Sequence, residues 1–330
     1  MVSILEADRM ISLSPCKPDM RHGKAPFERT VPELLKSGVV FLDKPRGPTS
    51  HQTAAWVRDV LGVEKAGHHG TLDPNTTGVL PIAVGSGLRL LDSTLSEGKE
   101  YIALMGLHKE IDDRKLSQVL KEFTGEIYQM VPVRAAVRRG LRTRKVHQIK
   151  LIERDGRDVL ISVGCESGTY IRTLINDIGE VLGVGANMKE LRRSRSGSAT
   201  EDITVTLQQL SDAMVLYKEN GNEEHIRKAL MPCELLVSHM KKLVVKDTAV
   251  DALCHGAPLG IPGLSSVEDG IRKGDTIAMM SLKQELIALG EALSDYSTMI
   301  KASSGMAAKT TRVIMEPSTY PKGWKTKEVA

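Results

Sequence analysis

The chain has 330 residues, of which 41% are hydrophobic and 26% charged, and its net charge is +4. This length accommodates one large domain and a smaller one, and the composition excludes a largely disordered chain. No stretch reaches the roughly 20 apolar residues that span a bilayer, and the first residues lack the basic-then-apolar order of a secretory signal. The four cysteines lie far apart without a CxxC pair, so we expect reduced thiols and neither a zinc site nor a disulfide framework.

The first third of the chain begins with a polar segment and continues with a strand and a helix. Residues 1–36 are weakly periodic, and we expect them to form an extension that packs on the second domain. The apolar run at residues 39–43 predicts a buried strand, which ends in a segment rich in proline and glycine. Thr49 or Ser50 then caps a helix that Gly62 closes.

The middle of the chain predicts two more helices and a hairpin. Leu116, Val119 and Leu120 recur at helical spacing within residues 113–124, and Gly125 follows them. Asp155-Gly156 separates two β-rich runs, as in a tight hairpin. A third helix follows Thr169, with an apolar stripe of Ile171, Leu174, Ile175, Ile178 and Leu182. Because strands and helices interleave, we expect an α+β fold on a mixed, mainly antiparallel sheet at residues 37–238.

The composition changes near residue 218, and a second domain is expected at residues 239–316. From Lys241 onward the chain reads as short strands separated by Gly and Pro, most clearly at residues 277–280 and 285–289. This length suits a compact β-rich unit, and residues 317–330 are left as a C-terminal tail.

Positive charge is clustered rather than evenly spread. Seven Lys or Arg residues and no acid lie between Arg134 and Lys150, and Lys189, Arg192, Arg193 and Arg195 form a second cluster. Such clusters are typical of a surface that binds a polyanion, but an ordinary solvated face explains them equally well.

Two segments stand out as candidates for chemistry. Residues 67–81, GHHGTLDPNTTGVLP, hold a single acid, Asp73, which the following proline restrains. Two other interpretations of this segment compete with a catalytic one. It could be a nest of backbone amides that binds phosphate, or a structural turn in which the Asp73 side chain bonds its own backbone. In residues 165–174, Arg172 falls in the first turn of a predicted helix, where the helix dipole disfavours a cation, so a specific partner is expected.

These motifs together resemble the TruB superfamily of pseudouridine synthases, and within it the H/ACA guide-RNA-dependent dyskerin family of archaea and eukaryotes. The resemblance runs from residue 27 to residue 325. The matching segments are residues 43–51, 67–81, 99–101, 168–172, 191–197, 312–315 and 319–324.

The resemblance implies a catalytic set of Asp73, Tyr101 and Arg172. The loop aspartate of this family is catalytic, so Asp73 would act as nucleophile or base while the uracil detaches, rotates and rejoins the sugar through carbon. Arg172 would pair with Asp73 in a water-poor pocket, where loss of a fully buried partner costs about 3–5 kcal/mol. Tyr101 would stack on the uracil and accept the proton from its carbon. The family needs neither cofactor nor metal.

The resemblance also implies residues that bind the substrate. Tyr170 and Leu191 would line the pocket. Tyr101 and Tyr170 could instead be aromatic residues of the core. His68 would contact the RNA near a uridine that has been flipped out of its helix. Two positions depart from the family pattern. His69 stands where the family usually has a very small residue, and Ser198-Ala199 stands where an aromatic residue often follows.

RNA contacts are expected in both domains. Residues 239–316 resemble a PUA domain, a small β-barrel-like RNA-binding module that grips the guide-RNA end in this family. Gly256 and Gly260 would lie in its RNA-facing loops, although plain turns explain them too. In the first domain we expect contacts from Arg138, Arg139, Arg142, Arg144, Lys145, Arg192 and Arg193.

The preferred hypothesis is a guide-dependent synthase with guide RNA, substrate RNA, small H/ACA protein partners and no membrane contact. Its principal substrate would be rRNA, with tRNA as a second substrate. The alternatives are a standalone synthase for the T-loop uridine of tRNA, a non-catalytic RNA scaffold, and a nucleotidyltransferase. No lysine-rich tail of the eukaryotic kind is present, so we expect an archaeal, cytoplasmic protein, or a nucleolar one if it is eukaryotic.

Overall fold

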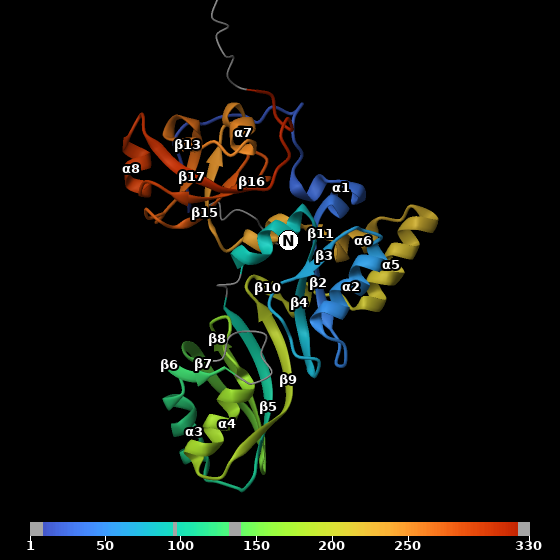
Figure 1. Ribbon diagram of the computed structural model, residues 1–330, viewed down its shortest axis with the longest axis vertical. Helices are drawn as coiled ribbons and strands as arrows, with labels where there is room; N and C mark the ends of the chain where they lie inside the picture. The colour runs from blue at the N-terminus through green and yellow to red at the C-terminus, as the bar shows by residue number, and fades with distance from the viewer. Residues whose placement is uncertain (1–8, 95–97, 132–139, 323–330) are drawn as a thin grey trace, which may run out of the picture. The chain divides into compact units, whose positions relative to one another are not determined.

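The computed structural model describes residues 9–94, 98–131 and 140–322, which divide into two compact units (Figure 1). The central unit comprises residues 40–83 and 91–229, and the terminal unit comprises residues 1–39, 84–90 and 230–330. Both contain helices and strands, so the α+β prediction is confirmed. Within the described part of the chain, no helix has the length and apolar character needed to cross a membrane.

The central sheet is mixed and mainly antiparallel, with the strand order β2-β4-β9-β5-β8-β7-β6. Strands β4 and β9 pair in parallel, whereas β5–β9, β5–β8, β7–β8 and β6–β7 are antiparallel. Its strands, with the short β3 and β10, are β2 (Ser37–Lys44), β3 (Ala66–His68), β4 (Thr76–Gly85), β5 (Lys99–Leu107), β6 (Gly125–Met130), β7 (Leu141–Asp155), β8 (Asp158–Cys165), β9 (Ala186–Ser196) and β10 (Ala199–Thr200).

Helices cover the central sheet in two groups. Helices α3 and α4 pack together on strands β5, β7 and β9 and bury one apolar core, whereas α2 and α5 pack against each other (Figure 1). The helices are α2 (Ser50–Leu61), α3 (Asp113–Glu122), α4 (Ile171–Leu182), α5 (Leu207–Asn220) and α6 (Glu224–Ala229).

The predicted strand at residues 39–43, the three predicted helices and the Asp155-Gly156 hairpin are all present. The Thr49 side chain accepts a hydrogen bond from Gln52 N, and the Gln52 side chain accepts one from Thr49 N, so the start of α2 is capped reciprocally. Gly62 ends α2 in the left-handed conformation that glycine adopts without strain.

The terminal unit contains a second sheet with the order β1-β14-β12-β15-β16-β17-β13 around its own apolar core. The predicted strand pair is present as β15 and β16, and β1 from the N-terminal segment pairs with β14. Its elements are β1 (Met10–Ser12), α1 (Val31–Lys36), β11 (Met231–Pro232), β12 (Lys241–Val245), α7 (Asp247–Cys254), β13 (Leu259–Gly260), β14 (Leu264–Glu268), β15 (Thr276–Met280), β16 (Leu286–Ala292), α8 (Tyr296–Lys301) and β17 (Met306–Val313).

Strand β9 was not predicted, because its residues read as a basic cluster. Side chains alternate between the two faces of a strand, so neighbouring arginines have different environments. Arg193 is only 1% exposed, whereas Arg192 is partly exposed. The charge pattern therefore reflects a strand that carries one basic side chain into the interior.

The parallel pairing of β4 with β9 brings two distant segments together. Thr76 lies opposite Leu191, and Gly78 lies opposite Arg193. Gly78 has φ +103°, and a Cβ atom there would lie 2.2 Å from the carbonyl oxygen of Arg193. Only glycine permits this close approach of the two backbones.

Two buried cations hold the segment that joins β3 to β4. Lys44, which is 0% exposed, donates through Nζ to the carbonyl oxygens of Asp73 and Pro74 at 3.3 Å and of Thr76 at 2.9 Å. Arg193 donates through Nε to Val79 O at 2.8 Å and through Nη2 to Gly70 O at 3.0 Å. Together these hydrogen bonds fix the backbone of residues 70–79.

His69 adds a third support. Its Nδ1 lies 3.0 Å from Leu91 O, and its Nε2 lies 3.2 Å from Lys99 Nζ, which also donates to Ser196 Oγ at 2.9 Å. Burial, reinforced by the Lys99 charge, lowers the pKa of His69 to about 3. The neutral ring therefore donates to the carbonyl and accepts from the ammonium group.

Gly78→Ala should lower the free energy of unfolding by about 2–4 kcal/mol, because it adds a backbone clash to the strain of a positive φ. Gly62→Ala is the matched control, since Gly62 has φ +67° with nothing within 4 Å of the added Cβ. Chemical denaturation of both variants measures the difference. Equal losses would show that the β4–β9 approach is not tight.

His69→Gln should reduce the loss of stability in acid. The folded pKa of about 3 lies below the ordinary 6.5, so the unfolded chain binds the proton first. The stability contribution is therefore complete above pH 6.5 and declines as the pH falls toward 3, by about 1.4 kcal/mol per pH unit. Unfolding free energies of both proteins at pH 7 and pH 4.5 test this. A constant difference between the two proteins would show that His69 does not titrate differently on unfolding.

Candidate active site

Asp73 and Arg172 form an ion pair between the β3–β4 segment and the first turn of α4. Arg172 Nη2 donates to Asp73 Oδ2 at 2.6 Å. The turn at Asp73 is closed by its backbone, since Thr76 N donates to Asp73 O at 3.0 Å. The carboxylate is directed at the guanidinium, so Arg172 has the specific partner that its place at the helix start predicted, and this partner is Asp73, as the resemblance implied.

The pair is not buried, which corrects the expectation of a water-poor pocket. The side chains of Asp73 and Arg172 are 55% and 50% exposed. An ion pair with this exposure contributes about 0–1 kcal/mol to folding, and not the 3–5 kcal/mol of a buried pair. Its geometry is held by the elements that carry it.

Tyr101 lies on β5 opposite Arg193 of β9 and packs against the core under α4. Burial raises the pKa of Tyr101, and the positive charge of Arg193 opposes the shift. The Asp73 charge also raises this pKa, which shows that the two side chains are electrostatic neighbours. The ring is therefore a neutral phenol in a fixed orientation.

Tyr170 and Leu191 lie on the elements that frame this ion pair. Tyr170 is the N-cap residue of α4, two positions before Arg172. Leu191 lies between Thr76 of β4 and Ala103 of β5 in the sheet, and it packs against the same core as Tyr101. Asp73, Tyr101, Tyr170, Arg172 and Leu191 thus come from neighbouring elements of one unit.

His68 lines a cavity of about 420 Å³ together with His51, Arg58 and small residues of α2 and β3. The His51 and His68 rings meet edge to face with centroids 4.7 Å apart. Burial, His51 and Arg193 lower the pKa of His68 to about 4, and its Nδ1 is buried without a hydrogen-bond partner among the described residues. The His68 imidazole is therefore neutral at pH 7.

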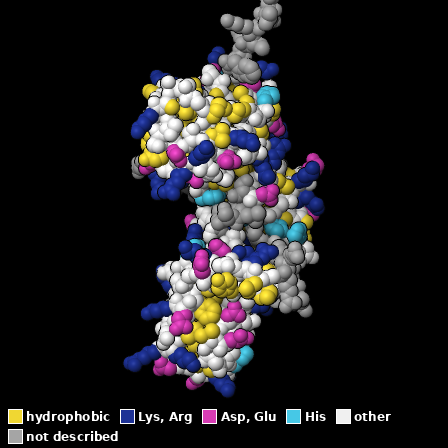
Figure 2. Space-filling view, turned by 60° about the vertical axis from the view of Figure 1, so that its left-hand side comes forward, with side chains coloured by type: hydrophobic (Ala, Val, Ile, Leu, Met, Phe, Trp, Pro, Cys, Tyr) yellow, Lys and Arg dark blue, Asp and Glu magenta, His cyan; other side chains and the backbone are white. Residues whose placement is uncertain are grey.

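The structure separates the basic residues that the sequence grouped together. Arg138 and Arg139 lie outside the described residues. Arg142 and Lys145 lie on β7, where Lys145 is exposed and Arg142 is partly exposed. On the face seen in Figure 2, Lys and Arg side chains are interspersed with Asp and Glu rather than gathered apart from them.

Three arginines already have protein partners. Arg144 donates to Gly168 O at 3.0 Å, and Arg192 holds Asp43 with two hydrogen bonds of 2.9 and 3.1 Å. Arg193 is buried under the β3–β4 segment, so its assignment to an RNA-binding surface is wrong. Alternation along β9 accounts for the error, because charge on this strand does not imply exposure.

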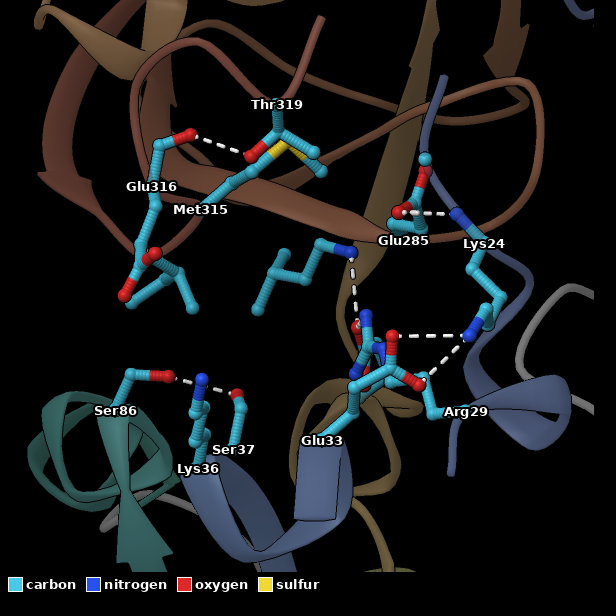
Figure 3. A pocket seen from close by; sticks show the side chains of 14 residues that line it. Lys24, Arg29, Glu33, Lys36, Ser37, Ser86, Glu285, Met315, Glu316 and Thr319 are labelled. Atoms are coloured by element: carbon cyan, nitrogen blue, oxygen red, sulfur yellow. Dashed lines mark hydrogen bonds and ion pairs between the residues drawn. The ribbon is translucent and has the colours of Figure 1, made fainter. Parts of the chain in front are cut away.

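In the terminal unit, Gly256 is exposed in a left-handed turn after α7, and Gly260 lies partly exposed in β13. A cavity of about 420 Å³ in this unit is lined by charged side chains that pair with one another (Figure 3). Lys24 pairs with Glu33 at 2.8 Å, and Arg29 pairs with Glu234 at 2.7 Å. This pairing is typical of a structural junction rather than an RNA site.

Among the residues the structure describes, no group of three or more His, Cys, Asp or Glu side chains is arranged to hold a metal ion. Sequence reasoning assigned no role to two residues next to this site: Lys44, which binds the Asp73 segment, and Gln129, whose side chain binds the backbone of Tyr170. Lys44 lies in residues 43–51, one of the segments that carry the family resemblance, but the resemblance did not indicate a role for its side chain. Gln129 shares the inward face of β6 with Ile127, and a polar residue on an apolar face was the available signal.

Family matches cover almost the whole chain. Residues 58–171 match the N-terminal domain of the TruB family of pseudouridylate synthases, and residues 172–238 match the C-terminal domain of tRNA pseudouridylate synthase B. Residues 241–314 match the PUA domain, and residues 2–54 match the DKCLD domain.

Similar proteins and solved structures agree with these matches. A protein of Methanopyrus kandleri named "Probable tRNA pseudouridine synthase B" is 48% identical over 318 residues, which cover 96% of this chain and 94% of the relative. One of the same name from Pyrobaculum aerophilum is 50% identical and covers 92% of each chain.

An H/ACA ribonucleoprotein structure bound to a substrate RNA with 2′-deoxyuridine matches with a TM-score of 0.90, 45% identity and coverage of 96% and 97% of the two chains. A Cbf5-Nop10-Gar1 complex matches with a TM-score of 0.90, 47% identity and coverage of 95% and 96%. Identity of this extent over nearly the full length establishes that the chain belongs to the TruB family of pseudouridine synthases.

Proposed function

We propose that this pseudouridine synthase uses Asp73 as its catalytic carboxylate and acts as the catalytic subunit of a guide-RNA-dependent complex. The observation that carries the catalytic part is the Asp73–Arg172 ion pair of 2.6 Å, framed by Tyr101, Tyr170 and Leu191. A carboxylate aimed at a guanidinium on an exposed edge can meet a nucleotide that arrives from solution.

The chemistry is an isomerisation with no net change in atoms. The bond between N1 of uracil and C1′ of the ribose breaks, the base rotates, and a bond from C5 to C1′ forms. The proton on C5 leaves and N1 gains one, so a carboxylate that acts as nucleophile or base suffices.

The surrounding residues suit this reaction. The guanidinium of Arg172 stabilises the ionised Asp73, and a flipped uridine that covers both groups would exclude water and strengthen their attraction. Tyr101 suits stacking on the uracil because its ring is fixed and neutral. Because burial raises the pKa of Tyr101, its hydroxyl stays protonated at neutral pH, so we assign the proton from C5 to another acceptor.

The guide-dependent assignment rests on the structural likeness to H/ACA complexes. The matched structures include one bound to substrate RNA and one that contains Nop10 and Gar1. We propose that this chain likewise binds guide RNA and small partner proteins, that its PUA domain holds the guide, and that rRNA is the principal substrate.

A second candidate is a standalone synthase for the T-loop uridine of tRNA. The names of the relatives from Methanopyrus kandleri and Pyrobaculum aerophilum favour it. The two candidates share the site at Asp73 and differ only in how the substrate reaches it.

Asp73→Asn should abolish pseudouridine formation, with a loss of at least about a thousandfold, because the amide is neither nucleophile nor base. RNA affinity and melting temperature should stay close to those of the unmodified protein, since the ion pair is half exposed. Asp59→Asn, which removes a comparably exposed Asp–Arg pair, is the control. Substantial turnover by Asp73→Asn would remove Asp73 from the mechanism.

Conversion of a chosen uridine should require a complementary guide RNA. The full chain with its small partner proteins is incubated with rRNA and tRNA fragments, with or without guide, and pseudouridine is mapped. A change in the pairing segment of the guide should move the modified position correspondingly. Efficient conversion of tRNA by the chain alone would favour the standalone enzyme.

A further inference from the structure

Gln129 is a buried glutamine at the end of β6 whose side chain binds the backbone of a different segment. It is 1% exposed. Its Nε2 donates to Tyr170 O at 3.0 Å, and its Oε1 accepts from Tyr170 N at 3.0 Å. The side-chain amide thus pairs with both polar groups of one residue, as a neighbouring strand would.

Tyr170 is an unusual N-cap residue. N-cap side chains commonly accept a hydrogen bond from the first turn, which a tyrosine at this position does not do, and α4 has no side-chain cap. Tyr170 O also accepts from Leu174 N at 3.0 Å, the first hydrogen bond of the helix. Gln129 therefore fixes the residue from which α4 starts.

The β6–β7 hairpin holds this helix start from two strands. Gln129 lies opposite Arg142 in the β6–β7 ladder, and Arg144, two residues further along β7, donates to Gly168 O at 3.0 Å. Gly168 has φ +82° and lies directly before Thr169 and Tyr170. The turn that leads into α4 is thereby attached at two backbone positions.

Arg172 needs such support because its own side chain is half exposed. Its direction toward Asp73 depends on the orientation of the first turn of α4, two residues beyond the Gln129 contact. A rotation of that turn would change the distance between Arg172 Nη2 and Asp73 Oδ2, which is 2.6 Å in the ion pair.

We propose that Gln129 is a positioning residue that aligns Arg172 with Asp73 through the backbone of Tyr170. This inference rests on the proposed function of Asp73. It differs from that function because Gln129, which is buried behind Tyr170, acts without touching the uridine.

The test is Gln129→Leu in the complete complex with guide and substrate RNA, measured as a single-turnover rate constant with enzyme in excess. We expect the rate constant to fall by about 10- to 100-fold, as for small misplacements of catalytic groups. The dissociation constant for substrate RNA should stay within about twofold, because RNA contacts are unchanged. Gln118→Leu is the matched control, since Gln118 is an exposed glutamine on α3.

A double-mutant cycle distinguishes positioning from general damage. If Gln129 acts through Arg172, then Gln129→Leu should cause little further loss of rate in an Arg172→Ala background. With folded complex still in saturating excess over substrate, a misfolded fraction that does not bind RNA leaves the rate constant unchanged. Independent, multiplicative losses, or an unchanged rate constant for Gln129→Leu, would overturn the inference.

Gln129→Glu covers the case in which the leucine variant does not fold. Its carboxylate keeps the acceptor for Tyr170 N but loses the donor to Tyr170 O, and protonation would restore that donor. The rate of Gln129→Glu relative to the unmodified complex should therefore rise as the pH falls, and a flat ratio would contradict the role. An inactive unmodified complex would refute the proposed function itself, whereas an active one that is insensitive to position 129 refutes only this inference.

Discussion

The active site depends on the hydrogen bonds from two buried cations to backbone carbonyl oxygens. The buried side chains of Lys44 and Arg193 donate hydrogen bonds to backbone carbonyl oxygens of residues 70–79. Burial of a charge is unfavourable unless hydrogen bonds compensate it, so these cations require the segment as much as the segment requires them. Burial lowers the pKa of Lys44, and the Asp73 carboxylate opposes that shift, so the Lys44 ammonium group is coupled electrostatically to Asp73.

The half-exposed ion pair has a functional meaning of its own. In the free protein, water screens the attraction between Asp73 and Arg172, so the pair contributes little to folding. A bound nucleotide would remove that water, and the same two charges would then interact more strongly. Under the proposed function, a bound uridine would therefore supply part of the water-poor environment, in agreement with an ion pair that is half exposed in the free protein.

The sequence predicts those parts of the fold whose signals are local. The cap at Thr49, the Asp155-Gly156 turn and the apolar stripe of α4 each specify structure through near neighbours, and each is present. The pairing of Asp73 with Arg172 followed from motif resemblance and from a cation at a helix start. Strand β9 escaped prediction because its basic residues hide the alternation of a strand. The inward position of Gln129 could have been read from the pattern of β6, but its contact with Tyr170 could not, since Tyr170 is 41 residues away and is contacted through the backbone.

The parallel pairing of β4 with β9 has a consequence for biosynthesis. Thr76 can meet Leu191 only after the intervening chain has been made, and parallel, long-range strand pairs form slowly in folding. At about 5–20 residues per second, translation delays this encounter by roughly 5–25 s. During that interval the nascent segment around Asp73 lacks its partner strand and its Arg193 support. A ribosome-bound chain of this enzyme therefore stays without its reactive centre until most of the central unit has emerged.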